Sequence, residues 1–113
     1  MRKAFLVCLN TWGFTFEELE AMTDEDLLTL LKKLNKEEYG KEFEPNRDFL
    51  IATVEVMVWN TTQWLKNGAS VRYESDVDIA IEELGIDLEK DDLEAVIDKL
   101  YDSYKNEVMN TNV

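Results

Sequence analysis

The sequence predicts a mainly α-helical protein with a single domain, residues 1–113, built as a bundle of five to six short helices around a central apolar helix. Three observations favour this fold class: glycines that can end helices recur along the chain, capping residues follow them, and apolar residues recur at intervals of three and four. With 113 residues, of which 45% are apolar, the chain can form one core without disulfides.

Three glycines, Gly13, Gly68 and Gly85, are expected to end helices. Glycine readily takes the left-handed conformation in which many helices end, and an apolar residue after it often folds back onto the last turn. The sequence offers an apolar partner for this contact at both Gly13 and Gly85. The expected fold-back pairs are Leu9 with Phe14 and Ile81 with Ile86.

The first segment, residues 2–11, is interpreted as a short helix because Gly13 follows it. A strand near 3–9 is the alternative, since this stretch is almost continuously apolar. If that strand pairs with a second one over 49–59, the fold class becomes α+β.

The second and third helices are expected to begin at Thr15 and Thr23. Each threonine has an acidic residue three positions later, Glu18 or Asp26, which is the spacing of a capping box. The third helix is expected to end near Asn35, and the polar segment that follows is expected to be the longest connection.

The central helix is predicted to begin after Asn46, which can act as its N-cap, and to continue through Asn67. Residues 49–59 are apolar on nearly every side, which is typical of a helix at the centre of a bundle. The valines and isoleucines in the same stretch leave a strand over 49–59 as the alternative.

An acidic carboxyl-terminal helical pair is predicted over 75–109. Ser75 is expected to cap the first helix, and the second is expected to begin between Asp87 and Asp91 and to run to about Met109. Apolar residues recur on one side of each helix. The expected inward residues are Val77, Ile81 and Leu84, then Leu93, Val96, Ile97, Leu100, Tyr104 and Val108.

The negative charge is concentrated in the last third of the chain. Residues 74–113 contain thirteen acidic and three basic residues and carry −10 of the formal charge of −13. Such a surface repels nucleic-acid phosphates and anionic membranes and attracts basic protein surfaces. The expected partner is therefore a basic protein, such as a nucleic-acid-binding enzyme, with no direct binding to nucleic acid or to a membrane.

The composition also argues against an enzyme, a cofactor and a metal site. The chain has no histidine, the commonest general base and a frequent zinc ligand, and no nucleophile motif or glycine-rich loop, so we expect no catalytic residue. Asp87, Glu89 and Asp91 alternate as in a calcium loop, but Asp92 stands where that loop requires glycine.

The single cysteine and the lengths of the apolar runs bear on the cellular location. Cys8 lies among apolar residues and is expected to be a buried, reduced thiol. No apolar run approaches the ~20 residues needed to span a bilayer. These features favour a cytoplasmic protein.

The acidic residues of the last helix suggest a function. Glu94, Asp98 and Asp102 recur at intervals of four and are expected to line one helix face, with neighbours ~6 Å apart. Such a face can take the place of a nucleic-acid backbone in a basic groove, although a purely solubilising face is the alternative. The residues expected to bind the partner are Glu82, Glu83, Asp87, Asp91, Glu94, Asp98 and Asp102.

In size and charge alone, with no shared motif, the chain is similar to the nucleic-acid mimics that phages use as anti-restriction and anti-CRISPR proteins. The first hypothesis is accordingly a small acidic, non-enzymatic inhibitor that blocks nucleic-acid access. The second is a helical adaptor or homo-oligomer that uses aromatic surface. The aromatic residues considered for that surface are Trp12, Trp59, Trp64, Tyr101 and Tyr104. The sequence leaves the oligomeric state open.

Overall fold

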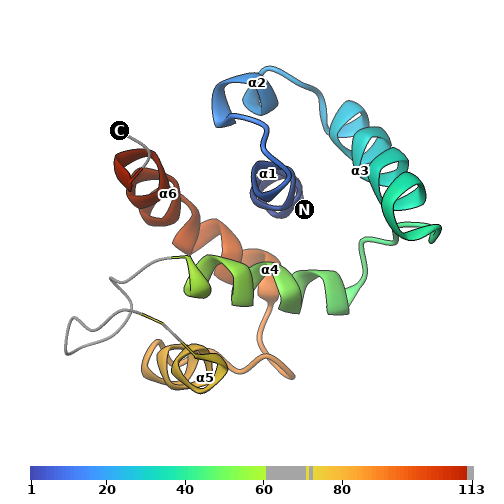
Figure 1. The fold of residues 1–113 in the computed structure, drawn as a ribbon. Coiled ribbons are helices and arrows are strands. Elements are labelled where there is room, and N and C mark those ends of the chain that lie inside the picture. Colours follow the sequence, from blue (N-terminus) through green and yellow to red (C-terminus); the bar gives the residue numbers. More distant parts are fainter. Residues whose placement is uncertain (61–70, 72, 112–113) are drawn as a thin grey trace.

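The computed structural model describes residues 1–60, 71 and 73–111, and this part of the chain contains six α-helices and no strand (Figure 1). The helices are α1 (Arg2–Thr11), α2 (Phe16–Glu20), α3 (Asp24–Tyr39), α4 (Arg47–Trp59), α5 (Glu74–Glu83) and α6 (Leu93–Thr111). The mainly α-helical fold class is thereby confirmed. Residues 3–9 and 49–59, for which strands were the alternative, lie within α1 and α4.

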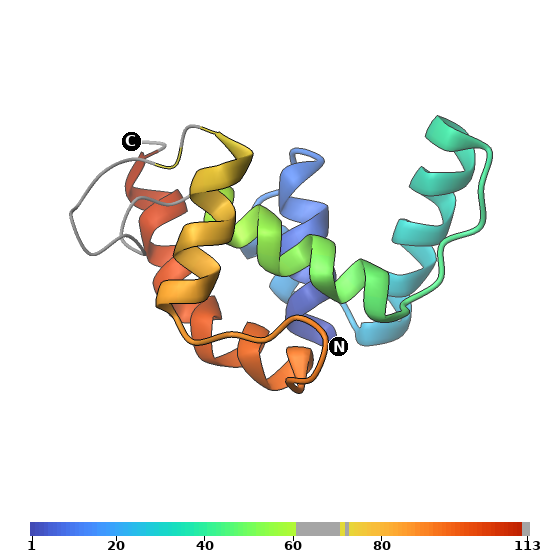
Figure 2. The same cartoon turned by 90° about the horizontal axis from the view of Figure 1, so that it is seen from below.

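Two apolar helices, α1 and α4, form the centre of the molecule. α1 packs against α2, α3, α4 and α6, and α4 packs against α1, α5 and α6. In Figure 1 α1 is seen end-on among its neighbours, and Figure 2 shows α4 crossing it. The largest fully buried side chains of the core come from most of the helices: Leu9, Leu19, Leu27, Leu31, Met57, Leu93, Ile97 and Tyr104.

The predicted helix ends at Gly13 and Gly85 are confirmed. Both residues have positive φ angles, 108° and 74°. After each, the backbone N–H of the next residue bonds a carbonyl five residues earlier, Phe14 to Leu9 at 3.4 Å and Ile86 to Ile81 at 3.2 Å. These are the bonds of the Schellman motif, and they join the predicted pairs. Gly68 lies outside the described residues.

Three predicted N-caps are also confirmed. The side-chain oxygens of Thr15, Thr23 and Asn46 each accept a hydrogen bond from the backbone N–H three residues later, at 3.2, 3.1 and 3.1 Å. Each bond satisfies an N–H that has no partner within the helix. Helices α2, α3 and α4 therefore begin where the sequence indicates.

In the middle of the chain, α3 ends later and α4 ends earlier than the sequence predicts. The prediction that the third helix ends near Asn35 is wrong, since α3 continues to Tyr39 and ends at Gly40, which has a φ of 65°. The intervening lysine and glutamates are good helix formers, so their polarity does not signal a loop. α4 ends at Trp59, and residues 61–67, where it was expected to continue, lie outside the described residues.

The prediction that Ser75 caps the acidic pair is wrong. α5 begins at Glu74, and its N-cap is Tyr73, two residues before Ser75. The Asp76 carboxylate accepts a hydrogen bond from the Tyr73 backbone N–H at 3.1 Å. A carboxylate near the start of a helix satisfies a donor and interacts favourably with the helix dipole, so the acid replaces the serine.

The start of the last helix also differs from the prediction. α6 begins at Leu93, not between Asp87 and Asp91, because those two aspartates belong to a turn. The Ala95 backbone N–H lies 3.4 Å from the Asp92 carboxylate, which caps the first turn. The predicted inward residues of α5 and α6 are all buried or packed against the core, and Tyr101 is buried in addition.

Candidate acidic surface and the pocket between α4 and α5

The acidic face predicted for the last helix lies on α6. Glu94, Asp98 and Asp102 follow one another at intervals of four and are all exposed, while Ile97 and Tyr101, which border them on the helix, are buried. Residues four apart on a helix are neighbours, with Cβ atoms ~6 Å apart. These three carboxylates therefore form one stripe along the surface of α6, which we call the α6 acidic stripe.

Two carboxylates of the α6 acidic stripe carry most of its uncompensated charge. Glu94 forms a salt bridge with the Met1 amino group at 2.9 Å. Within the described residues, Asp98 and Asp102 form no salt bridge. The carboxylates of the stripe without a salt bridge among the described residues are therefore those at its second and third positions.

Lys105, one of the few cations of α6, forms a salt bridge with a residue of α2. Its Nζ forms a salt bridge with the Glu20 carboxylate, which also accepts a hydrogen bond from the Tyr101 hydroxyl at 3.1 Å. The hydrogen bond from Lys105 is the main cause that lowers the pKa of Glu20. Burial, followed by the hydrogen bond to Glu20, raises the pKa of Tyr101. This interaction joins α2 to α6 and reduces the charge that Lys105 adds to the surface.

Asp87 and Asp91 hold the turn that precedes α6. The Asp87 carboxylate accepts hydrogen bonds from the backbone N–H groups of Glu89 and Lys90, and the Asp91 carboxylate accepts one from the Asp87 N–H at 2.8 Å. Arg47 of α4 donates to a backbone carbonyl on the other side of this turn, that of Asp91, at 3.1 Å. These two aspartates therefore have a local structural role that the sequence did not predict.

The remaining candidates, Glu82 and Glu83, are exposed at the carboxyl-terminal end of α5. Both α5 and α6 pack mainly on α4 and not on each other. The structure therefore divides the seven candidate residues into three groups: the end of α5, the turn, and the α6 acidic stripe.

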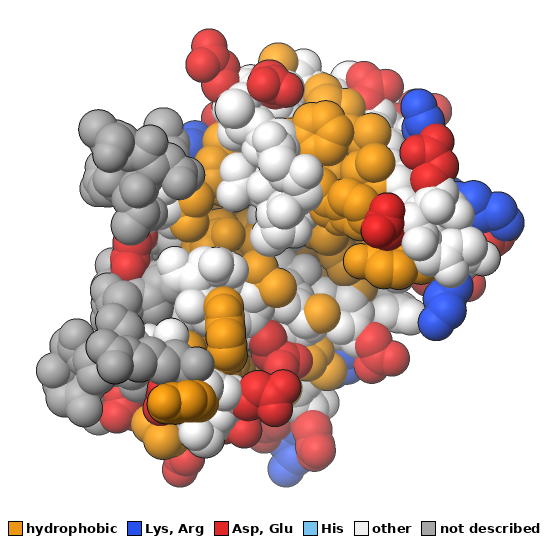
Figure 3. Space-filling view, in the orientation of Figure 1, with side chains coloured by type: hydrophobic (Ala, Val, Ile, Leu, Met, Phe, Trp, Pro, Cys, Tyr) orange, Lys and Arg blue, Asp and Glu red, His pale blue; other side chains and the backbone are white. Residues whose placement is uncertain are grey.

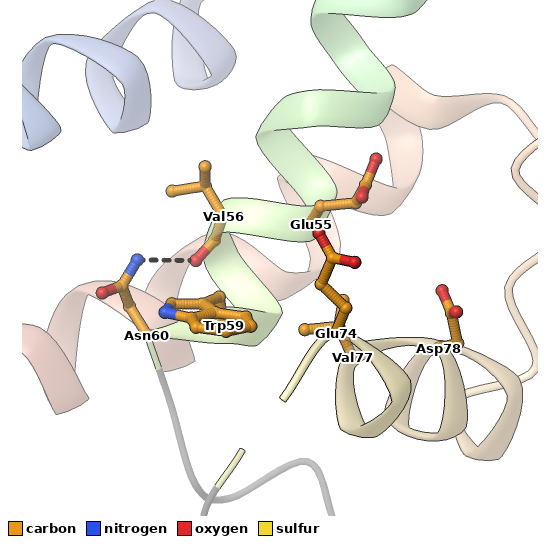
Figure 4. A pocket seen from close by; sticks show the side chains of 7 residues that line it. All are labelled: Glu55, Val56, Trp59, Asn60, Glu74, Val77 and Asp78. Atoms are coloured by element: carbon orange, nitrogen blue, oxygen red, sulfur yellow. Dashed lines mark hydrogen bonds between the residues drawn. The ribbon is translucent and has the colours of Figure 1, made fainter. Parts of the chain in front are cut away.

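A pocket of about 460 Å³ lies between the end of α4 and the start of α5 (Figure 4). Each helix contributes about one turn, and the lining includes both exposed and buried side chains. The lining residues are Glu55, Val56, Trp59 and Asn60 from the α4 end, and Glu74, Val77 and Asp78 from α5.

The acidic lining of this pocket is not among the residues that the sequence predicts to bind a partner. Glu55 and Trp59, and likewise Glu74 and Asp78, are four residues apart, so each pair is visible in the sequence as neighbours on a helix. What the sequence does not contain is the packing of α5 against α4, which brings the two pairs to one place.

The aromatic residues considered for an interface are distributed between core and surface. Tyr101 and Tyr104 are only 4% and 1% exposed and belong to the core. Trp12 is half-buried and its ring contacts that of Tyr39, with centroids 6.1 Å apart. Trp59 is 45% exposed, and Trp64 lies outside the described residues.

The Cys8 thiol is half-buried, less completely than its apolar neighbours suggested. Burial raises its pKa to about 11, partly offset by a hydrogen bond with the Trp12 side chain. A thiol with so high a pKa is protonated and weakly nucleophilic at neutral pH.

Charge is unevenly distributed over the surface. In Figure 3 most of the visible basic side chains lie near α3, whereas acidic side chains gather near α5.

Among the described residues there is no group of three or more acidic or cysteine side chains that could hold a metal ion. None of the described helices combines the length and apolar character needed to cross a membrane. Comparison of the chain with protein-family models, curated proteins and solved structures finds no match.

Proposed function

We propose that this protein is a small acidic inhibitor or regulator, without enzymatic activity, that binds a basic nucleic-acid-binding protein and blocks access of the nucleic acid. Phage anti-restriction and anti-CRISPR proteins act in this general way. The observation that carries the proposal is the α6 acidic stripe, an ordered and exposed row of carboxylates of which two have no salt-bridge partner within the described residues.

The spacing of the stripe supports mimicry of a nucleic-acid strand. Neighbouring carboxylates on a helix face are ~6 Å apart. Successive phosphates of one strand are separated by roughly 6 to 7 Å along the backbone, with an axial rise of ~3.4 Å. A basic groove that binds successive phosphates can therefore pair with Glu94, Asp98 and Asp102 in turn. The net charge of −13 attracts such a groove from a distance.

The experiment measures displacement of DNA from purified nucleases, one restriction endonuclease and one CRISPR nuclease with its guide RNA. Fluorescence anisotropy of a labelled duplex reports displacement as the protein is added. The test variant carries Glu94→Lys, Asp98→Lys and Asp102→Lys. The control variant carries Glu37→Lys, Glu38→Lys and Glu42→Lys, which change the net charge equally at exposed positions of the amino-terminal half.

We expect the unmodified protein and the control to displace DNA from at least one nuclease, and the α6 variant to lose this ability. The affinity is expected to fall as salt is raised, because salt screens exposed charges. Failure to displace DNA from either nuclease, or equal loss in both variants, contradicts the proposal. So does an affinity that is insensitive to salt.

The alternative function, a helical adaptor or homo-oligomer, has its own supporting observation. In Figure 3 apolar side chains gather between α1 and α3, the region where Trp12 contacts the 62% exposed Tyr39. Exposed apolar patches often mark protein interfaces. Size-exclusion chromatography with light scattering distinguishes the two functions. A stable homo-oligomer that Tyr39→Ser converts to a monomer supports assembly, and a monomer at all concentrations contradicts it.

A further inference from the structure

We propose that the pocket between α4 and α5 binds the side chain of an arginine residue presented by a protein partner. The pocket combines three carboxylates with an exposed indole and an apolar floor, and this chemistry suits a planar cation. None of its residues belongs to the α6 acidic stripe. The inference rests on the proposed function only in taking the partner to be a basic protein.

The geometry brings one face of each helix to the same space. On α4, Glu55 and Trp59 are one turn apart, and on α5, Glu74 and Asp78 are one turn apart. In Figure 4 the Glu74 side chain extends from α5 toward α4, and the Trp59 indole lies beside it. Val77 is only 5% exposed and supplies an apolar part of the lining.

The end of α4 is held in place by a local hydrogen bond. The Asn60 side-chain amide donates to the Val56 carbonyl at 2.9 Å, drawn as a dashed line in Figure 4. The Asn60 amide is therefore engaged with the helix end. The polar groups that face a ligand are chiefly the carboxylates.

The charges of the described lining residues favour a positively charged ligand. Among its described lining residues there are three carboxylates and no cation. Within the described residues, Glu55, Glu74 and Asp78 form no salt bridge. Glu74 and Asp78 lie four apart on α5, where like charges repel. A bound cation reduces this repulsion, whereas an anion increases it.

Arginine fits this arrangement better than lysine. Its planar guanidinium can stack on an indole while its N–H groups bond carboxylates in pairs. Its aliphatic stem can lie along Val56 and Val77, which line the pocket. A lysine ammonium supplies the charge but neither the plane nor the paired donors. The volume of about 460 Å³ accommodates one such side chain with some water.

The test uses the full-length protein and the peptide Ac-Gly-Arg-Gly-NH2, with the matching citrulline peptide as a neutral control of the same shape. Binding is followed by NMR through the indole N–H signal of Trp59, assigned with Trp59→Phe. We expect the arginine peptide to shift this signal in a saturable way. The citrulline peptide is expected to produce no saturable shift, and the matching lysine peptide to bind less tightly than arginine.

Two isosteric double variants separate the pocket from the overall charge. Glu74→Gln with Asp78→Asn removes two charges from the pocket, and Asp98→Asn with Asp102→Asn removes two from the α6 acidic stripe. Because the replacements keep side-chain size at exposed positions, both proteins are expected to fold, which NMR confirms directly. The pocket variant is expected to bind the arginine peptide at least about fivefold more weakly, whereas the stripe variant stays within about twofold.

The results that overturn the pocket are distinct from those that overturn the proposed function. Equal weakening in the two variants, equal binding of citrulline, or no saturable shift of the Trp59 signal refutes the arginine pocket, whether or not the protein displaces DNA. Failure of the unmodified protein to displace DNA from either nuclease, with binding of the arginine peptide intact, refutes the proposed inhibitor and leaves the pocket supported.

Discussion

Replacement of Asp98 by lysine is expected to stabilise the folded protein while it weakens binding to a basic partner. Asp98 lies between Glu94 and Asp102 at intervals of four, so it takes part in two like-charge pairs on the surface of α6. Each such pair destabilises a helix by ~0.2–0.5 kcal/mol, and an attractive pair stabilises it by a similar amount.

The magnitude follows from these pairs. Asp98→Asn removes both repulsions without a new attraction, and asparagine has about the same helix propensity as aspartate. The Met1 amine already compensates Glu94, with 2.9 Å between the charged atoms, which reduces one of the two repulsions. We therefore expect a gain of ~0.5 kcal/mol for Asn and ~1 kcal/mol or slightly more for Lys, which also adds two attractive pairs and a better helix former.

Urea denaturation of the three proteins at low salt, monitored by circular dichroism, measures these gains. In 1 M salt, where the Debye length is ~3 Å, the gain from Asn is expected to vanish and that from Lys to shrink to the propensity difference of a few tenths of a kcal/mol. A lysine variant that is less stable than the unmodified protein refutes the reasoning, as does a gain that salt does not reduce.

Three further predictions concern the scaffold. Gly85→Ala is expected to destabilise the protein by ~1–2 kcal/mol in urea denaturation, because φ is 74° and no neighbouring atom lies within 4 Å of the added Cβ, so the cost is that of the backbone alone. Glu20→Gln is expected to lower the stability at pH 7 through loss of the bond to Lys105. Because the folded state lowers the pKa of Glu20, this difference is present above its ordinary value of 4.5 and is lost as the pH falls through the folded value; a difference that persists at pH 2 contradicts this assignment. Cys8, with its pKa raised to about 11, is expected to react with a thiol reagent at pH 8 far more slowly in the folded protein than in urea, and equal rates contradict its protection.

The fold was largely predictable because its signals are local. A glycine that ends a helix and a threonine that begins one act within six residues, so Gly13, Gly85, Thr15 and Thr23 could be assigned without knowledge of packing. The errors occurred where two local signals compete. At α5 the Asp76 carboxylate replaced Ser75 as the capping group, and before α6 the aspartates formed a turn instead of a first helical turn.

The candidate site was predictable only along a single helix. The α6 acidic stripe needs no more than the helical repeat, and Glu94, Asp98 and Asp102 lie where that repeat places them. The pocket depends on two helices that meet through their apolar faces, and nothing in the order of residues specifies that Trp59 will face Glu74. Side chains from different elements converge through tertiary packing, which short-range patterns do not encode.

The two ends of α4 contact two different parts of the molecule, the turn that leads into α6 and the pocket. Arg47, the first residue of α4, binds the turn that leads into α6, and Trp59, the last residue of α4, lines the pocket. A helix rises ~1.5 Å per residue, so these two ends are separated by about 18 Å. A partner that binds the pocket and also contacts the turn that leads into α6 must therefore span about this length of α4.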